Sequence, residues 1–239
     1  MKGIGGSLNI YASDLYRNYY NKVWSSGLQG LGSRWMLNSL YKKLIRSEGQ
    51  RILEIGAGSG EALKFILPTP IWETYVALDQ NCGLADPSLF KSIKRGDFAD
   101  FGPVNFVNAR AESIPYPDNY FDAAISTCVL AHVTDPEKVF SELRRVTKPN
   151  GQIVILLPCD PGVMNRFFKI LITYPKMKRS GINNPRLEYA REHRNAIGNL
   201  IAIANHVFAR DKKFWKAIPL RLYSWNFNLF FLFDCKVIK

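Results

Sequence analysis

A short stretch of the chain combines a carboxylate with three closely spaced glycines. Residues 51–60 read RILEIGAGSG, an apolar run that contains Glu54 and then Gly56, Gly58 and Gly60. Glycine permits positive φ angles and lets a ligand approach the main chain, because it has no Cβ atom. The apolar run predicts a buried strand, and the carboxyl ends of such strands border the ligand crevice of open α/β sheets. We therefore expect a ligand at this turn.

A second carboxylate follows at a spacing that suits a ribose. The next expected strand, TYVALDQ, ends in Asp79, nineteen residues after Gly60. An acid at that place can accept hydrogen bonds from ribose hydroxyls. The glycine spacing, G-x-G-x-G, differs from the dinucleotide fingerprint G-x-G-x-x-G. Because Glu54 would repel a pyrophosphate, the turn favours a cationic, zwitterionic group, such as an adenosine that carries an amino acid and a positive sulfur.

Together with later segments, these motifs resemble the class I S-adenosylmethionine-dependent methyltransferases, most closely their broad branch that acts on small molecules and lipids. The resemblance covers about residues 50–160: LEIGAGSGEALKFI, then YVALDQN, then the run from ARAESIP to GQIVILLP. It implies a methyltransferase with S-adenosyl-L-methionine as cofactor. It also implies that the methionine portion is held by Glu54, near its ammonium, and by the main chain at Gly56, Ala57, Gly58 and Gly60.

The resemblance implies further roles around the nucleoside. Asp79 would bind the ribose hydroxyls, and Gln80 would lie beside the adenine. The main chain of Ala111, in ARAESIP, would meet the edge of the adenine ring. Many relatives have an acidic or small polar residue where this chain has Arg110, so Glu112 is the candidate for recognition of the adenine by a side chain.

Methyl transfer from a sulfonium requires alignment and a dry site, because the cofactor carries its own leaving group. A base is needed only where the nucleophile must lose a proton. The strand FDAAIST ends at Ser126 and Thr127, close to the sulfonium in such folds. Candidate catalytic residues are His132, which follows that strand, and Tyr189 and His193, one helical turn apart in EYAREHRN. A purely structural role is the alternative for all three.

Short apolar strands alternate with helical stretches from residue 51 onward, which indicates a parallel sheet covered on both faces. A helix is expected near 135–147, capped by Asp135 with Pro136 at its first position, and two strands near 214–222 and 227–238. We expect an α/β fold: a doubly wound Rossmann-like sheet, mostly parallel with an antiparallel C-terminal strand, plus N-terminal helices and a helical cap inserted before the last two strands. Residues 1–239 would form a single domain, with an N-terminal helical cap (1–50), a cofactor-binding core (51–160), a helical substrate cap (161–210) and C-terminal strands (211–239).

The net charge of +12 is distributed unevenly along the chain. Residues 1–50 contribute +5, residues 51–159 contribute −3, and residues 160–239 contribute +10. Basic flanks around an acidic centre indicate an anionic partner, with a solvated basic surface as the alternative. Segment 165–179, NRFFKILITYPKMKR, adds bulky apolar side chains to basic ones, as in a helix that rests on an anionic membrane surface. A lid helix packed on the core is the other interpretation.

The composition of the chain indicates in which cellular compartment the protein is expected. No uncharged apolar stretch reaches the roughly 18–20 residues of a membrane span, and the N-terminal segment lacks the apolar core of a signal peptide. The cysteines at 82, 128, 159 and 235 are scattered, which fits reduced thiols in a cytosolic protein and no metal site. We expect a cytoplasmic protein, with peripheral contact at the inner membrane face left open.

The leading hypothesis is methylation of a small or lipid-linked, anionic acceptor, with oxygen favoured as the methylated atom. One alternative is an RNA methyltransferase whose basic flanks track phosphates. Nucleic acid is the less favoured partner, because the chain shows no recognised RNA-binding module and no N-P-P-Y/F tetrad after FDAAIST. A non-catalytic module that binds S-adenosylmethionine is the other alternative, and the intact Glu54, glycines and Asp79 argue against it.

Overall fold

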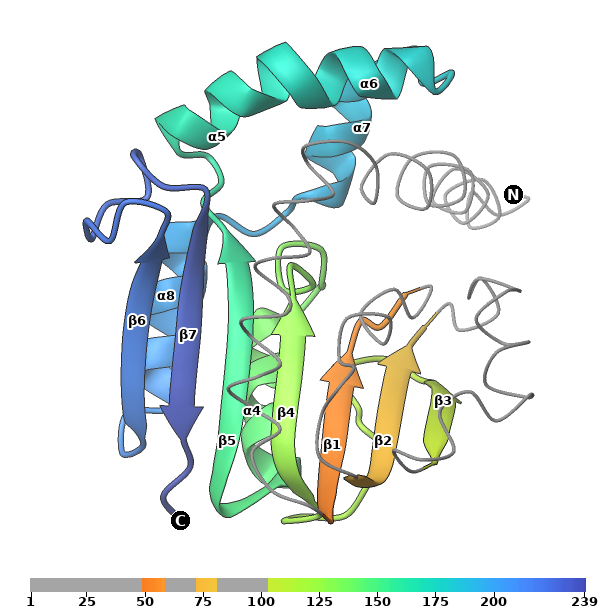
Figure 1. Cartoon of the computed structure of the whole chain (residues 1–239), viewed down its shortest axis with the longest axis vertical. Helices are drawn as coiled ribbons and strands as arrows, with labels where there is room; N and C mark the ends of the chain where they lie inside the picture. Colours follow the sequence, from red (N-terminus) through yellow and green to blue (C-terminus); the bar gives the residue numbers. More distant parts are fainter. Residues whose placement is uncertain (1–48, 59–71, 81–102) are drawn as a thin grey trace, which may run out of the picture.

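The computed structural model describes residues 49–58, 72–80 and 103–239, which build a seven-stranded sheet (Figure 1). Five strands pair in parallel in the order β3 (Val104–Asn108), β2 (Trp72–Asp79), β1 (Gln50–Ile55), β4 (Phe121–Thr127) and β5 (Thr147–Pro158). The sheet continues with β7 (Phe230–Lys236), antiparallel to β5, and β6 (Lys212–Ile218), antiparallel to β7. The predicted fold class is confirmed.

The direction of chain progression reverses between β1 and β4, and this switch point of the sheet is called the crevice below. The chain builds outward from β1 to β2 and β3, then returns to place β4 on the other side of β1. The loops that leave β1 and β4 therefore diverge at the carboxyl ends of these strands, which is where open α/β sheets bind ligands.

The central strands are buried along most of their length because both faces of the sheet are covered. The last four residues of β1 and the last six of β5 are buried, as expected for parallel strands. On one face the core includes Leu53, Phe140 and Phe233. On the other it includes Trp72 and Tyr75.

Two helices pack on the first of these faces, namely α4 (Pro136–Val146) and α8 (Ile197–Val207) (Figure 1). The predicted start of α4 is confirmed: the side chain of Asp135 accepts a hydrogen bond from the main-chain N–H of Lys138 at 2.9 Å, and Pro136 occupies the first turn. Val139, Phe140, Leu143 and Val146 recur at helical spacing and are buried against the sheet.

The helical insertion predicted before the last two strands is also confirmed. It begins with α5 (Val163–Phe168), the π-helical η5 (Lys169–Thr173) and α6 (Tyr174–Arg179), which follow one another as a continuous run beyond the carboxyl end of β5 (Figure 1). The chain returns through α7 (Pro185–Glu192) toward α8. No helix within the described ranges has the length and apolar character to cross a membrane.

Some predictions fall on residues that the structure does not describe. The N-terminal helices and the helix expected at EALKFIL lie outside the described residues. The proposed division into a core, caps and C-terminal strands stays a prediction.

The cap of α4 supports a stability prediction. Asp135→Ala leaves the Lys138 N–H without its partner, so it should lower the free energy of unfolding by about 1 kcal/mol in denaturant titrations. Asp135→Ser should restore most of this loss, since serine is an equally good cap. Equal destabilisation by serine and alanine would show that the loss does not come from the capping hydrogen bond.

Candidate active site

The turn after β1 is tied to the end of β2 by its main chain. The N–H groups of Gly56 and Ala57 both donate to the carbonyl of Leu78, at 2.7 and 3.2 Å. The next N–H, that of Gly58, donates to Oδ2 of Asp79 at 3.0 Å. The glycine turn and the predicted ribose carboxylate, 21 residues apart, are therefore in direct contact.

Gly56 is required by space as well as by conformation. Its φ angle is +67°, and an added Cβ atom would lie 2.0 Å from Cγ2 of Val129. Val129 belongs to the turn after β4, so the two turns that border the crevice touch each other at this glycine. Gly58 also has a positive φ angle, +55°. Gly60 lies outside the described residues.

Glu54 is buried one residue before the end of β1, with 1% of its surface exposed. Its Oε2 accepts a hydrogen bond of 2.7 Å from the hydroxyl of Tyr75 on β2. A buried carboxylate needs such partners, because removing a charge from water without hydrogen bonds is costly. The sequence did not identify Tyr75 as the partner of Glu54, because nothing distinguishes it from any other aromatic residue in a strand.

The residues predicted to surround the adenine follow the carboxyl ends of β2 and β3. The N–H of Ala109, after β3, donates to the carbonyl of Asp79 at 3.3 Å, which joins the two strand ends. Ala111 is buried, and Gln80 is exposed. This arrangement brings the segment of Ala111 to the same edge of the sheet as Asp79.

Arg110, the departure from the family pattern, forms an ion pair with Glu112 at 3.2 Å. Glu112 also accepts a hydrogen bond from the main chain of Thr134. Burial acts to raise the pKa of Glu112, but the hydrogen bonds from Arg110 and the main chain outweigh it and lower the pKa. The carboxylate therefore stays ionised and is held at the edge of the crevice.

Ser126, near the end of β4, is fully buried, and its Oγ has no hydrogen-bond partner among the described residues. It lies beside Ile55 in the pairing of β1 with β4, next to the glycine turn. An unsatisfied buried hydroxyl is unfavourable, so its presence at this crevice fits a site that receives a polar ligand. This hydroxyl, the bare turn and the carboxylate of Asp79 beside it are compatible with S-adenosylmethionine.

The structure brings the three candidate catalytic residues together. The ring of His193 stacks on that of Tyr189 with 3.9 Å between centroids. The ring of His193 also contacts the ring of His132 edge-to-face, with centroids 4.5 Å apart. His193 caps the C-terminus of α7, whereas His132 follows β4, so the cap insertion and the core meet at this pair.

Asp160 organises this cluster and was missed by the sequence analysis. The Tyr189 hydroxyl donates to its Oδ2 at 2.6 Å, and Nδ1 of His193 lies 3.0 Å from the same oxygen. Its other oxygen, Oδ1, pairs with Nζ of Lys169, which is buried in η5. Burial acts to raise the pKa of Asp160, but the hydrogen bonds from His193, Lys169 and Tyr189 hold that pKa far below its usual range. The available signals were an acid two residues after the last parallel strand and one lysine within FFKILI.

His132 is held in its neutral form. Its Nδ1 lies 3.0 Å from the carbonyl oxygen of Glu192, and since that oxygen can only accept, we assign the proton to Nδ1. Burial, together with the neighbouring His193, lowers the pKa of His132 to about 3. Nε2 is then an acceptor at neutral pH.

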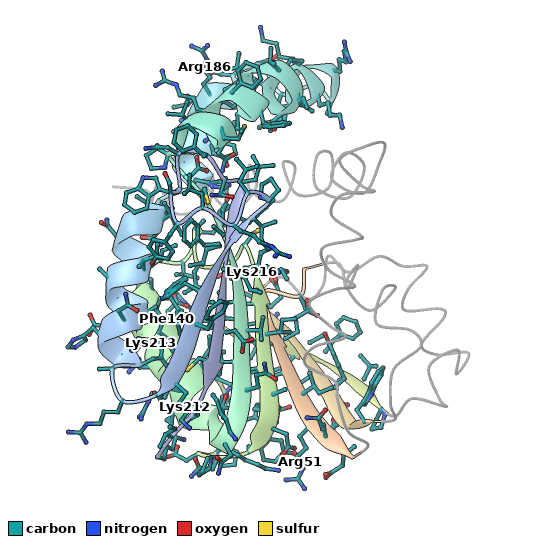
Figure 2. All side chains as sticks on the ribbon, turned by 60° about the vertical axis from the view of Figure 1, so that its left-hand side comes forward. Arg51, Phe140, Arg186, Lys212, Lys213 and Lys216 are labelled. Carbon is teal, nitrogen blue, oxygen red and sulfur yellow. The ribbon has the colours of Figure 1, made fainter. Side chains whose placement is uncertain are left out.

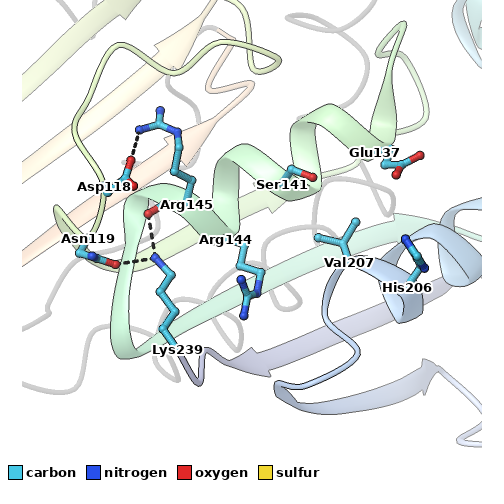
Figure 3. Close-up of a pocket in the computed structure, with 9 residues that line it drawn as sticks. All are labelled: Asp118, Asn119, Glu137, Ser141, Arg144, Arg145, His206, Val207 and Lys239. Atoms are coloured by element: carbon cyan, nitrogen blue, oxygen red, sulfur yellow. Dashed lines mark hydrogen bonds and ion pairs between the residues drawn. The ribbon is translucent and has the colours of Figure 1, made fainter.

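A surface hollow beside α4 lies away from this crevice (Figure 3). It begins near Asp118 and Asn119, which precede β4, and so lies toward the amino ends of the strands. Two of its cations already have partners within the protein: Arg145 pairs with Asp118 at 2.8 Å, and Lys239 donates to the carbonyl of Arg145 at 2.9 Å. The hollow thus lies where Lys239 packs against α4. Within the described ranges, no cluster of three or more His, Cys, Asp or Glu side chains could hold a metal ion.

Comparison with known proteins agrees with this geometry. Residues 53–155 match the family described as "Methyltransferase domain". The chain is 37% identical over 137 residues to "Ubiquinone/menaquinone biosynthesis C-methyltransferase UbiE" of Serratia proteamaculans, a match covering 57% of this chain and 52% of that protein. The Vibrio cholerae protein of the same name is 31% identical over 166 residues, covering 66% and 60%. The chain thus spans little more than half the length of these relatives.

A solved structure shows the same fold. The Haemonchus contortus phosphoethanolamine N-methyltransferase 2, in complex with S-adenosyl-L-methionine, superimposes with a TM-score of 0.61 at 15% identity, covering 94% of this chain and 60% of that one. At this identity the likeness concerns the fold alone.

Residues 53–155 contain the glycine turn, both carboxylates and all of β4, so the family match falls on the crevice described above. Residues 53–155 therefore carry a methyltransferase domain, and this match supports the class I, S-adenosylmethionine-dependent family. This confirms the family, the enzyme class and the cofactor predicted from the sequence.

The shifted pKa of His132 predicts how stability depends on pH. An unfolded histidine titrates near pH 6.5 and the folded one near 3, so the unfolded state binds more protons in this window. The contribution of His132 to stability is therefore present above about pH 6.5 and is lost on acidification. We expect His132→Gln to reduce the loss of unfolding free energy between about pH 7 and pH 5 by about 1–2 kcal/mol, measured by denaturant titration.

The matched control is His206→Gln, at an exposed position on α8. A pH dependence of stability that is identical in wild type and His132→Gln would contradict the neutral state of His132.

Proposed function

We propose that this protein transfers a methyl group from S-adenosylmethionine to a small or lipid-linked, anionic acceptor. The observation that carries the proposal is the contact between Gly58 and Asp79: it sets a bare main-chain turn beside a carboxylate, with Glu54 next to them, at the switch point of the sheet. A positively charged sulfonium nucleoside with a free amino acid group matches that combination.

Each part of the bound cofactor would contact a different group of residues at the crevice. Glu54 would face the ammonium, with the main chain at Gly56, Ala57, Gly58 and Gly60 around the methionine portion. Asp79 would exchange part of its bond with the turn for the ribose hydroxyls. Gln80, Ala111 and Glu112 would surround the adenine, and the Ser126 hydroxyl would gain a polar partner near the sulfonium.

The cluster around Asp160 would serve the acceptor. It lies at the carboxyl end of β5, next to β4, which is the side where the sulfonium methyl would be presented. Asp160 fixes the orientation of His193 through the 3.0 Å contact between its Oδ2 and Nδ1 of the ring. His193 is therefore the group in this cluster best placed to take a proton from an acceptor as it is methylated.

Two methylated atoms fit this chemistry. Oxygen was favoured from the sequence, as an acidic hydroxyl that loses its proton to a base. Carbon is the second candidate, because the relatives from Serratia and Vibrio are named C-methyltransferases of ubiquinone and menaquinone biosynthesis. A ring carbon made electron-rich by an adjacent anionic oxygen would need the same removal of a proton.

The acceptor class can be tested by incubating the protein with methyl-labelled S-adenosylmethionine and fractionated cell material. We expect the label in the organic-soluble or small-molecule fraction. Label in nucleic acid would instead support the RNA methyltransferase, and cofactor binding without any labelled product would support a non-catalytic module. Analysis of the labelled product by mass spectrometry and NMR then distinguishes O-methylation from C-methylation.

Asp79→Ala tests the cofactor pocket separately from the acceptor. It removes charged hydrogen bonds to the ribose, so we expect cofactor affinity measured by calorimetry to fall by about 1–3 kcal/mol. Asp118→Ala, which removes a carboxylate from the distant hollow, is the control and should leave affinity unchanged. Unchanged affinity in Asp79→Ala would count against this pocket.

A further inference from the structure

The continuous helix formed by α5, η5 and α6 has its apolar side on the outside. Lys169 and Met177, eight residues apart, are buried, and Thr173 between them is half-buried, so this stripe faces the protein. Its main polar contact is the pair between Lys169 and Asp160. A surface helix normally buries its apolar side, so this arrangement is inverted.

The outer side carries large apolar side chains at helical spacing. Val163, Phe167, Ile170 and Leu171 are 64%, 57%, 44% and 57% exposed. Their spacing of four, three and one residues places them on a common face. Contiguous exposed apolar surface of this kind marks an interaction site rather than a chance surface residue.

The loop between β6 and β7 extends this surface. Leu222, Tyr223, Trp225 and Phe227 are all between 40% and 58% exposed. The loop adjoins the start of α5, because the N–H of Met164 donates to the carbonyl of Asn226 at 2.9 Å (Figure 1). The outer side of α5–η5–α6 and this loop together are called the apolar crest below.

The loop is held in a fixed shape although its side chains face outward. Asn228 is fully buried, and its Nδ2 donates to the carbonyls of Leu222 and Ser224, both at 2.8 Å. Its Oδ1 accepts from the N–H of Leu220 at 2.9 Å. The exposed aromatic residues are therefore presented by a braced loop, which reduces the entropy lost when they bind.

The charge around the crest has a single sign. Residues 161–187 contain six Lys or Arg and no Asp or Glu, and residues 219–229, the loop between β6 and β7, contain one Arg and no Asp or Glu. Arg166, Lys178 and Arg179 are exposed beside the apolar side chains. Arg186 lies at the cap end of the molecule, far from Arg51 at the other end (Figure 2). Such a surface is complementary to an anionic one.

We propose that the apolar crest docks on an anionic lipid bilayer, with its helix lying in the plane of the interface. The run from Val163 to Arg179 is about 25 Å long, and its bulky side chains with flanking Lys and Arg are the composition of interfacial helices. Tyr223 and Trp225 suit the headgroup level, where rings with an apolar body and a polar tip partition.

Docking would also serve the reaction, and this part rests on the proposed function. Lys169 is on the inner side of the same helix and contacts the Asp160 cluster. A bilayer on the outer side therefore lies one helix away from the proposed acceptor site. A lipid-linked acceptor could then pass from the membrane to the site without crossing water.

The test is co-sedimentation with vesicles of phosphatidylcholine alone and of phosphatidylcholine mixed equally with phosphatidylglycerol. We expect binding to the anionic vesicles that weakens as salt is raised, since surface charges are screened. Phe167→Ser combined with Leu171→Ser should weaken binding by about tenfold or more, from the loss of buried apolar surface. Trp225→Ser should weaken it in the same direction.

The matched control is Phe214→Ser on β6, which removes a side chain that is 64% exposed but lies outside the crest. It should leave vesicle binding unchanged. Lys178→Ser should weaken binding to the anionic vesicles, because it removes a positive charge beside the apolar side chains. Lys212→Ser is its control and should leave binding unchanged, because Lys212 is exposed at the far end of β6 (Figure 2). Circular dichroism of each variant verifies that it is folded.

Absence of binding to anionic vesicles, or equal loss in Phe214→Ser and the crest variants, would overturn the proposal. So would a stable dimer in gel filtration that Phe167→Ser with Leu171→Ser dissolves, because a second copy would then cover the crest. Cofactor affinity, measured by calorimetry without lipid, separates the two ideas. Intact affinity without vesicle binding rejects docking alone, whereas vesicle binding without cofactor affinity rejects the proposed function alone.

Discussion

The arrangement of the site depends on how closely the turn after β1 packs between the ends of its two neighbours. On one side the turn donates three main-chain hydrogen bonds to Leu78 and Asp79. On the other, Gly56 touches Val129 so closely that no side chain fits. This packing is possible only with glycine, and it fixes the distance between the carboxylate on β2 and the residues after β4.

A second centre forms where the cap insertion meets the core. Asp160 contacts Lys169 from η5, Tyr189 from α7 and His193, the residue that caps α7. The cost of burying this carboxylate is offset by charged hydrogen bonds, so the insertion and the end of β5 are mutually dependent. The family match ends at residue 155, just before Asp160. Cofactor chemistry thus resides in the shared part of the chain, whereas acceptor choice would reside in the later, basic part.

The sequence predicted the elements whose signals are local. Apolar runs identified the parallel strands, and Asp135 with Pro136 identified the start of α4. The C-terminal strands were expected at 214–222 and 227–238 but lie at 212–218 and 230–236, because Asn228 ties Leu220, Leu222 and Ser224 into a loop. Asp160 and Lys169 could not be paired from sequence, since a lysine within FFKILI carries no sign of being buried. Likewise, the bond between Tyr75 and Glu54 depends on the register of β1 with β2.

The most direct measurement is a crystal structure of the protein grown with S-adenosylmethionine. The account predicts the ribose hydroxyls on Asp79, the ammonium near Glu54, and the sulfonium methyl pointing past Ser126 toward the cluster of Asp160 and His193. Cofactor bound at another place, or oriented with its methyl group away from that cluster, would contradict it.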